Sequence, residues 1–133
     1  DSSTLMDYFM KEVRVHLELA VPVWHSGLTQ QLSADIERVQ RIAVSIILGD
    51  YQLPYDQACT TLGLKPLYIR QMELCERFAV KTASESRHND LFQLEKDGSH
   101  NTWSREDIFR EYICRKTRFY NSPLPFLTRT LNQ

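Results

Sequence analysis

The feature that most constrains the fold is a set of apolar residues at helical spacing, divided into segments by proline and glycine. Between positions 29 and 48 the apolar side chains recur every three or four residues, as one face of an amphipathic helix requires. They are Leu32, Ile36, Val39, Ala43, Ile46 and Ile47. Gly49 follows at once and predicts the end of this helix, which we expect to begin at Thr29 or Ser33.

The same spacing and similar stop signals predict four further helices. The first covers residues 2–21 and ends at a proline, and so little of its surface is polar that we expect it to be central. A short helix is predicted over residues 54–62 and a longer one over residues 66–84. A last short helix is expected over residues 126–131, after an extended or turning stretch that two prolines impose on residues 122–125.

The composition agrees with long regular elements, because the 133 residues include only four glycines and five prolines. With 42% apolar residues the chain can bury a proper core. We therefore predict a mainly α fold, a compact bundle of about four to five helices with a less regular basic C-terminal segment. Residues 1–86 would form the bundle, and residues 87–133 a polar loop and a basic segment packed on the same domain. Residues 108–120 fit either a helix or a strand.

The sequence contains no recognisable motif for catalysis or for metal binding. Its three cysteines are widely spaced, without a Cys-x-x-Cys pair, so we expect reduced thiols in an intracellular protein, cytoplasmic or nuclear. The four histidines lack metal-site spacing, and the acid pair Glu106-Asp107 is best interpreted as the start of a helix. We predict no enzyme activity, cofactor or metal for this chain alone. No apolar run is long enough for a membrane, and the start at Asp1 indicates a piece of a longer protein.

Basic side chains are unevenly distributed along the chain. Residues 105–133 contain six basic and three acidic residues, which leaves ten basic and fourteen acidic residues in the rest. Arg70, Arg77 and Lys81 are expected on one side of the fourth helix, over roughly 16 Å, where they could follow the phosphates of a duplex. Glu73 lies among them at ion-pair spacing, so a self-neutralised surface is the alternative.

A second basic group lies near the C-terminus. Arg115, Lys116 and Arg118 precede two aromatic residues, Phe119 and Tyr120. Cations beside aromatic rings suit nucleic acid, because charge attracts the phosphates and the rings can stack on bases. The alternative, which we weigh equally, is a loop whose two rings pack inward.

Local contacts can also be predicted. Trp24 lies in the turn between the first two helices, and we expect it to be a structural anchor there. Opposite charges four residues apart predict ion pairs on helix surfaces: Asp7 with Lys11, Arg14 with Glu18, and Glu37 with Arg41.

Residues along nearly the whole chain match a known pattern, although most of them are packing residues. The first matching stretch is 17–25, with the sequence LELAVPVWH, and a later one runs from Arg118 to Ser122. The other matching positions are Leu32, residues 36–40, Ala43, Ile46, Ile47, Tyr55, Ala58, Cys59, residues 62–64, Leu67, Arg70, Phe78, and residues 125–132. Together they resemble the region after the polymerase core in reverse transcriptases of non-LTR retrotransposons (LINE elements) of the Jockey-like kind.

The resemblance implies the thumb and C-terminal region of an RNA-directed DNA polymerase encoded by a transposable element. In that family the thumb is a helical bundle that holds the template–primer duplex, and the catalytic palm lies upstream. The implied partners are the backbone of an RNA–DNA duplex and the polymerase palm of the parent protein. The candidate nucleic-acid contacts are Arg70, Arg77, Lys81, Arg115, Lys116 and Arg118.

Three positions depart from the family pattern, which often has basic residues around Ile42 and Ser45 and at Gln71. The absence of basic residues at these positions removes cations from surfaces that should face nucleic acid. Either this copy is decaying or has been recruited elsewhere, or the duplex is held through other contacts. The alternative function is a helical protein–protein interaction or scaffolding domain, which would use an exposed apolar patch instead of basic side chains.

Overall fold

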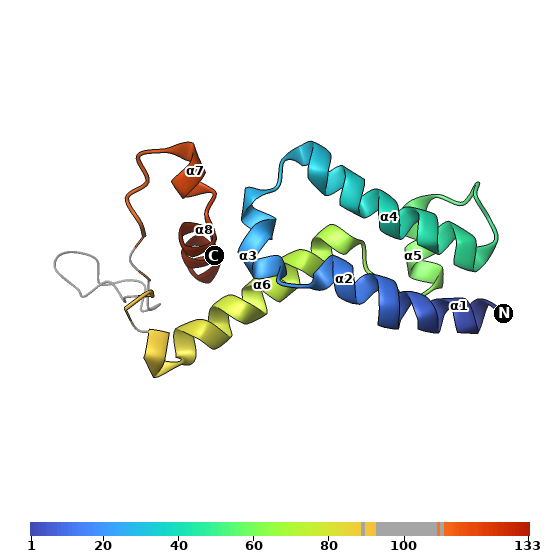
Figure 1. Cartoon of the computed structure of the whole chain (residues 1–133), viewed down its shortest axis with the longest axis horizontal. Coiled ribbons are helices and arrows are strands. Elements are labelled where there is room, and N and C mark those ends of the chain that lie inside the picture. The colour runs from blue at the N-terminus through green and yellow to red at the C-terminus, as the bar shows by residue number, and fades with distance from the viewer. Residues whose placement is uncertain (89, 93–108, 110) are drawn as a thin grey trace. The chain divides into compact units, whose positions relative to one another are not determined.

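The computed structural model describes residues 1–88, 90–92, 109 and 111–133 (Figure 1). Helices make up the regular structure of this part of the chain, which contains no strand, and the mainly α prediction is confirmed. Much of the predicted polar loop after residue 86, together with the acid pair Glu106-Asp107, lies outside the described residues.

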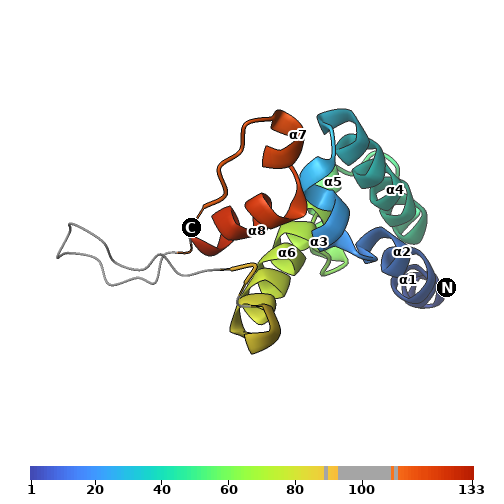
Figure 2. The same ribbon diagram turned by 60° about the vertical axis from the view of Figure 1, so that its left-hand side comes forward.

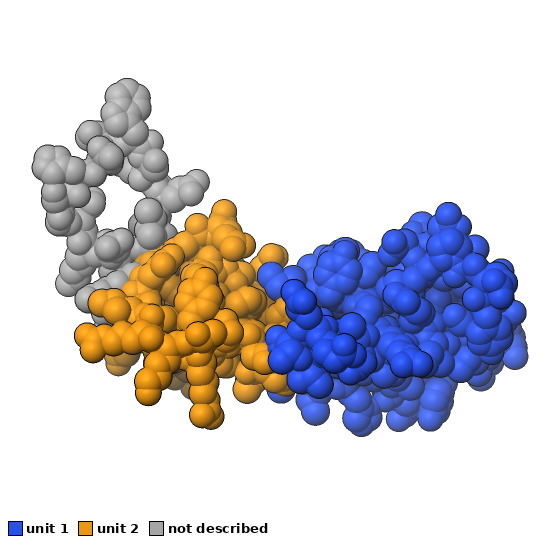
Figure 3. Space-filling model, turned by 90° about the horizontal axis from the view of Figure 1, so that it is seen from above, with its two compact units in different colours: residues 1–21, 28–73 blue, residues 22–27, 74–133 orange. Residues whose placement is uncertain are grey.

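The described chain divides into two compact units, which are coloured separately in Figure 3. The first unit contains residues 1–21 and 28–73, and the second contains residues 22–27 and 74–133. The domain division expected at residue 86 stays a prediction.

The first helical stretch ends earlier than expected. It consists of α1 (Ser2–Tyr8), a π-helical segment η1 (Phe9–Val13) and α2 (Arg14–Glu18). Leu19 is extended and Ala20 has a positive φ of 53°, so the chain leaves the helix before the proline. That proline lies inside the next short helix, α3 (Val21–Trp24), where a missing backbone N–H costs little. The prediction of one helix over residues 2–21 is therefore wrong.

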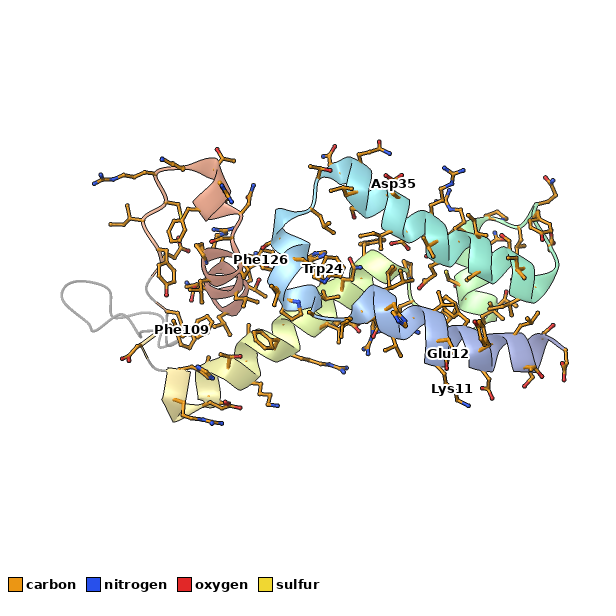
Figure 4. All side chains as sticks on the ribbon, viewed as in Figure 1. Lys11, Glu12, Trp24, Asp35, Phe109 and Phe126 are labelled. Carbon is orange, nitrogen blue, oxygen red and sulfur yellow. The ribbon has the colours of Figure 1, made fainter. Side chains whose placement is uncertain are left out.

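The expectation that this first stretch is central is also wrong. Phe9 is buried, but Tyr8, Val15 and Leu19 are 63%, 53% and 66% exposed. The apolar side chains of this stretch point in more directions than the other helices of the unit can cover. Lys11 and Glu12 lie on the side that faces away from α4 (Figure 4), and Lys11 forms the predicted ion pair, with 3.6 Å between its Nζ and the carboxylate of Asp7.

The bounds of the next helix, α4 (Gln30–Leu48), match the prediction, but Leu32, Val39 and Ile46 of its predicted apolar face are about half exposed. Its N-terminus is capped by Thr29, whose hydroxyl oxygen accepts a hydrogen bond of 3.2 Å from the backbone N–H of Leu32. Gly49 ends it in the left-handed conformation, with a φ of 69°. Both signals are local, which explains why the sequence reveals them.

Two more helices also match their predictions within a residue or two. They are α5 (Tyr55–Thr61), followed by Gly63 with a φ of 66°, and α6 (Leu67–Ser84). In the first unit α1 lies beside α4 (Figures 1 and 2). The core of the first unit contains residues of η1, α4, α5 and the segment after α5: Phe9, Val44, Ile47, Ala58, Cys59 and Leu64. Full burial of a large apolar side chain such as Phe9 contributes roughly 1.5–3 kcal/mol.

The second unit contains the helices α7 (Thr117–Tyr120) and α8 (Pro123–Leu131). The last helix begins three residues earlier than predicted, because prolines fit a first helical turn, where no N–H is needed. The ring of Phe126 on α8 contacts that of His25 in the short 3-10 helix η2 (His25–Gly27), with 6.0 Å between centroids. Within residues 108–120, the described part before α7 has no regular structure.

Candidate nucleic-acid interface

Glu37 fixes the start of α6, the helix that carries three of the predicted cations. Its carboxylate accepts hydrogen bonds from the backbone N–H groups of Leu67 (2.8 Å) and Tyr68 (2.9 Å), and from the hydroxyl of Tyr55. The first N–H groups of a helix have no partner within it, so this carboxylate acts as a cap supplied by another helix. The described residues contain no ion pair between Glu37 and Arg41, so that prediction is wrong; the Arg41 guanidinium lies over the Tyr55 ring, 5.1 Å from its centroid.

Buried polar groups support this cap. The amide Nε2 of Gln40, which is fully buried, donates to the Tyr55 hydroxyl and to the carbonyl of Lys65, both at 2.9 Å. Burial, followed by the hydrogen bond to Glu37, raises the pKa of Tyr55 well above its usual range, so the hydroxyl remains a donor. Burial also raises the pKa of Cys59, although hydrogen bonds with Tyr55 and Gln40 act in the opposite direction.

Arg70 is engaged by acidic residues of its own unit. Its Nε and Nη2 lie 3.2 and 3.4 Å from the two carboxylate oxygens of Glu18, and its Nη1 lies 3.8 Å from Glu73. Glu18 also forms the predicted pair with Arg14, with 2.6 Å between the carboxylate and Nε. A two-point contact between guanidinium and carboxylate is geometrically specific, and here it joins α2 to α6. For Arg70, then, the structure has the self-neutralised arrangement that was the alternative.

Gln71 on α6, where the resembling family often has a basic residue, is buried in the first unit. Gln71 is only 2% exposed, whereas Ile42 is half-exposed and Ser45 is half-buried. A cation at position 71 would thus be buried here instead of facing a ligand. Further along α6, burial raises the pKa of the Cys75 thiol to about 11, which keeps this buried group protonated and unreactive at neutral pH.

Arg77 and Lys81 form an exposed basic pair on α6. They lie one helical turn apart and make no ion pair within the described residues. Phe78 and Val80, next to them in sequence, are 43% and 61% exposed. This part of α6 therefore presents two available cations beside apolar side chains.

Arg115, Lys116 and Arg118 form a second exposed basic group, at the start of α7. None of the three makes an ion pair with a residue in the described ranges. Phe119 and Tyr120, which follow them, are 42% and 48% exposed, so neither ring is packed inward as the alternative required. We call residues 115–120 the basic aromatic segment.

No local sequence signal marks Arg129, which holds this segment in place. Its guanidinium lies over the Tyr120 ring, 3.7 Å from the centroid, and its Nη2 donates to the Tyr120 carbonyl at 2.9 Å. The ring of Tyr112 meets that of Phe119 edge to face, with 6.1 Å between centroids. Both aromatic side chains of the segment are therefore fixed by a neighbour.

Two further side chains attach the preceding stretch. The Tyr112 hydroxyl donates to the carbonyl of Leu91 at 2.6 Å. The side-chain amide of Asn132 forms two hydrogen bonds with the backbone of Phe109, each 2.9 Å long. Asn132, near the end of the chain, thus holds the backbone of Phe109, which precedes the basic aromatic segment. No local sequence signal predicts this role.

Metal sites, membrane-spanning helices and cavities are the other features that could indicate a function. The described residues contain no group of three or more His, Cys, Asp or Glu side chains able to hold a metal ion, and no described helix is long and apolar enough to cross a membrane. A depression of about 350 Å³ in the first unit is lined by Arg41, Val44, Ser45, Tyr51, Leu53, Pro54, Tyr55 and Ala58. Trp24, the expected anchor, is half-buried at the end of α3 (Figure 4), and its role stays a prediction.

Comparison of the chain with protein-family models, with curated proteins and with solved structures gives no significant match. Any functional conclusion therefore depends on residue pattern and geometry. Five of the six predicted contact residues are exposed and lie in the second unit, and the sixth, Arg70, lies ion-paired in the first unit.

Proposed function

We propose that this chain is a non-catalytic, thumb-like module of a retrotransposon reverse transcriptase that helps to hold an RNA–DNA template–primer duplex. The resemblance along the sequence and the helical fold support this proposal. The catalytic centre would belong to the polymerase palm of the parent protein, and the module would act inside the cell, in the cytoplasm or the nucleus.

The observation that carries the proposal is the basic aromatic segment. Three exposed cations lie within four residues and make no ion pair within the described chain. Exposed cations without acidic partners attract the phosphates of nucleic acid and release its condensed counterions on binding. Arg77 and Lys81 would add phosphate contacts without base specificity.

Arg70 has a different place in this proposal. Its contacts with Glu18 and Glu73 would have to be exchanged for a phosphate, which lowers the gain from binding. We therefore assign the duplex contacts to the other five predicted cations, Arg77, Lys81, Arg115, Lys116 and Arg118, which lie in the second unit.

The test is binding of the full chain to a blunt RNA–DNA hybrid at low salt, followed by fluorescence anisotropy. We expect a triple substitution, Arg115→Gln with Lys116→Gln and Arg118→Gln, to weaken binding about tenfold or more. A matched control removes three exposed cations elsewhere, through Lys11→Gln, Arg38→Gln and Arg87→Gln. The control should stay within about twofold of the wild type. Absent binding, or equal losses in both variants, would refute the proposal.

A second candidate function, a helical protein-interaction domain, is favoured by the outer face of α4. Leu32, Val39, Ile42 and Ile46 are 51%, 43%, 50% and 49% exposed, and their spacing places them along one side of the helix. Asp35 lies on the same outer side, away from α1 and α2 (Figure 4). Such a row of exposed apolar side chains is typical of a protein contact. A discrete oligomer in sedimentation that Ile42→Asp dissociates, together with no hybrid binding, would favour this function.

A further inference from the structure

The basic aromatic segment contains a feature that a duplex cannot use. In a duplex the faces of the bases are stacked on one another, so a protein meets only phosphates, sugars and groove edges. Phe119 and Tyr120 are nevertheless about half exposed, directly after three free cations. Aromatic faces gain most from an unpaired base, which offers a flat surface of its own.

The two rings are also held in advance of any ligand. Arg129 covers one face of Tyr120 and hydrogen-bonds to its carbonyl, and the rings of Tyr112 and Phe119 meet edge to face. A ring that is already oriented loses little conformational freedom when a base stacks on it. The Arg129 guanidinium behind Tyr120 adds positive charge near the same place.

The charge of the surrounding stretch favours a nucleic-acid strand over other flat ligands. Residues 111–133 contain four basic residues, Arg115, Lys116, Arg118 and Arg129, and one acidic residue, Glu111. A single strand offers a base and a phosphate at every nucleotide, so one short segment of protein can contact both.

We propose that the basic aromatic segment binds an unpaired extension of the template or primer, with a base stacked on Phe119 or Tyr120 and the adjoining phosphates at Arg115, Lys116 and Arg118. This inference rests on the proposed function, since it names the part of the nucleic acid that this site takes. On a blunt hybrid the same three cations would contact phosphates of the duplex, and Arg77 and Lys81 would contact the paired part in either case.

Three ligands test the inference with the unmodified full chain: a blunt RNA–DNA hybrid, the same hybrid with a single-stranded overhang, and the same hybrid with an abasic overhang. The abasic overhang keeps its phosphates and lacks bases. We expect the overhang with bases to bind roughly five- to hundredfold more tightly than the blunt hybrid, and the abasic one to lose most of that gain. An equal gain from the abasic overhang, or no gain from either, overturns the inference.

A double substitution, Phe119→Leu with Tyr120→Leu, gives an independent test because it keeps the charge and the apolar character. It should reduce the affinity for the overhang with bases to the level of the blunt hybrid and leave blunt-hybrid binding within about twofold. The matched control is Tyr51→Leu with Tyr68→Leu, two tyrosines that are 72% and 54% exposed in the first unit. A retained gain in the Phe119 and Tyr120 variant refutes stacking, whereas no binding to any of the three ligands refutes the proposed function itself.

Discussion

Arg70 and Arg118 have the same side chain but different surroundings. Arg70 meets two acidic residues, Glu18 and Glu73, and joins two helices, whereas Arg118 is exposed and makes no ion pair with the described residues. The sequence predicted both as surface cations, Arg70 from its position on a helix face and Arg118 from its place in a run of cations beside aromatic residues. It offered Glu73 as a possible partner of Arg70, but only the fold shows the contact with Glu18, which lies far from Arg70 in sequence.

Glu37 shows the same limit of sequence reasoning. Its spacing from Arg41 predicted a helix pair, but its carboxylate accepts two backbone N–H groups of α6 and the hydroxyl of Tyr55. The sequence distance from Glu37 to these N–H groups is about 30 residues. No local sequence pattern predicts a helix cap that comes from a residue so far away in sequence.

We predict that Tyr55→Phe lowers the free energy of unfolding by about 1–2 kcal/mol at neutral pH, because it removes a hydrogen bond to a charged group. The folded state raises the pKa of Tyr55, so above about pH 10 the unfolded chain loses this proton first and binds fewer protons. The stabilising contribution of the hydroxyl is thus complete below about pH 10 and is lost as the pH rises further. Urea unfolding across this range should show a steeper loss for the wild type than for the variant.

The control for this measurement is Tyr51→Phe, since Tyr51 is 72% exposed. It should leave the free energy of unfolding within about 0.5 kcal/mol of the wild type at every pH. If the free energy of unfolding fell equally with rising pH in the wild type and in Tyr55→Phe, the Tyr55 hydroxyl would not make the hydrogen bond that the structure shows.

At the scale of elements, helices with local end signals were predictable and the others were not. Thr29 and Gly49 mark both ends of α4, and Gly63 follows α5. The first stretch instead ends at Glu18, before Ala20, which adopts a positive φ although it has a Cβ, and a π-helical segment interrupts it at Phe9–Val13. Neither feature follows from the residues in these positions, because packing against the rest of the unit selects them.

Gly49→Ala should test the end of α4. A Cβ at this position would meet open space, but the φ of 69° strains any residue other than glycine. We expect the substitution to lower the free energy of unfolding by about 1 kcal/mol. Gly27→Ala is the matched control, since Gly27 also has open space and no positive φ, and it should change stability by less than about 0.5 kcal/mol. Equal effects in thermal unfolding would contradict the assigned conformation.

Across the whole molecule, the net charge of −1 hides a basic end and an acidic remainder. The sequence identified the exposed cations of α6 from their helical spacing, and those of the basic aromatic segment from their closeness in sequence. It did not identify Arg129 or Asn132, whose partners Tyr120 and Phe109 are 9 and 23 residues away. The chemistry of the candidate surface was thus predictable, and the contacts that hold it in place were not.

The central claim is that exposed cations of the second unit bind nucleic-acid phosphates, and salt dependence tests it most directly. The association constant for an RNA–DNA hybrid should be measured over a series of salt concentrations for the wild type and for the Arg115, Lys116 and Arg118 triple variant. We predict that the logarithm of the constant falls linearly with the logarithm of salt, and that the slope is smaller by about 2–3 in the variant. A slope near zero, or the same slope in both proteins, would contradict the account.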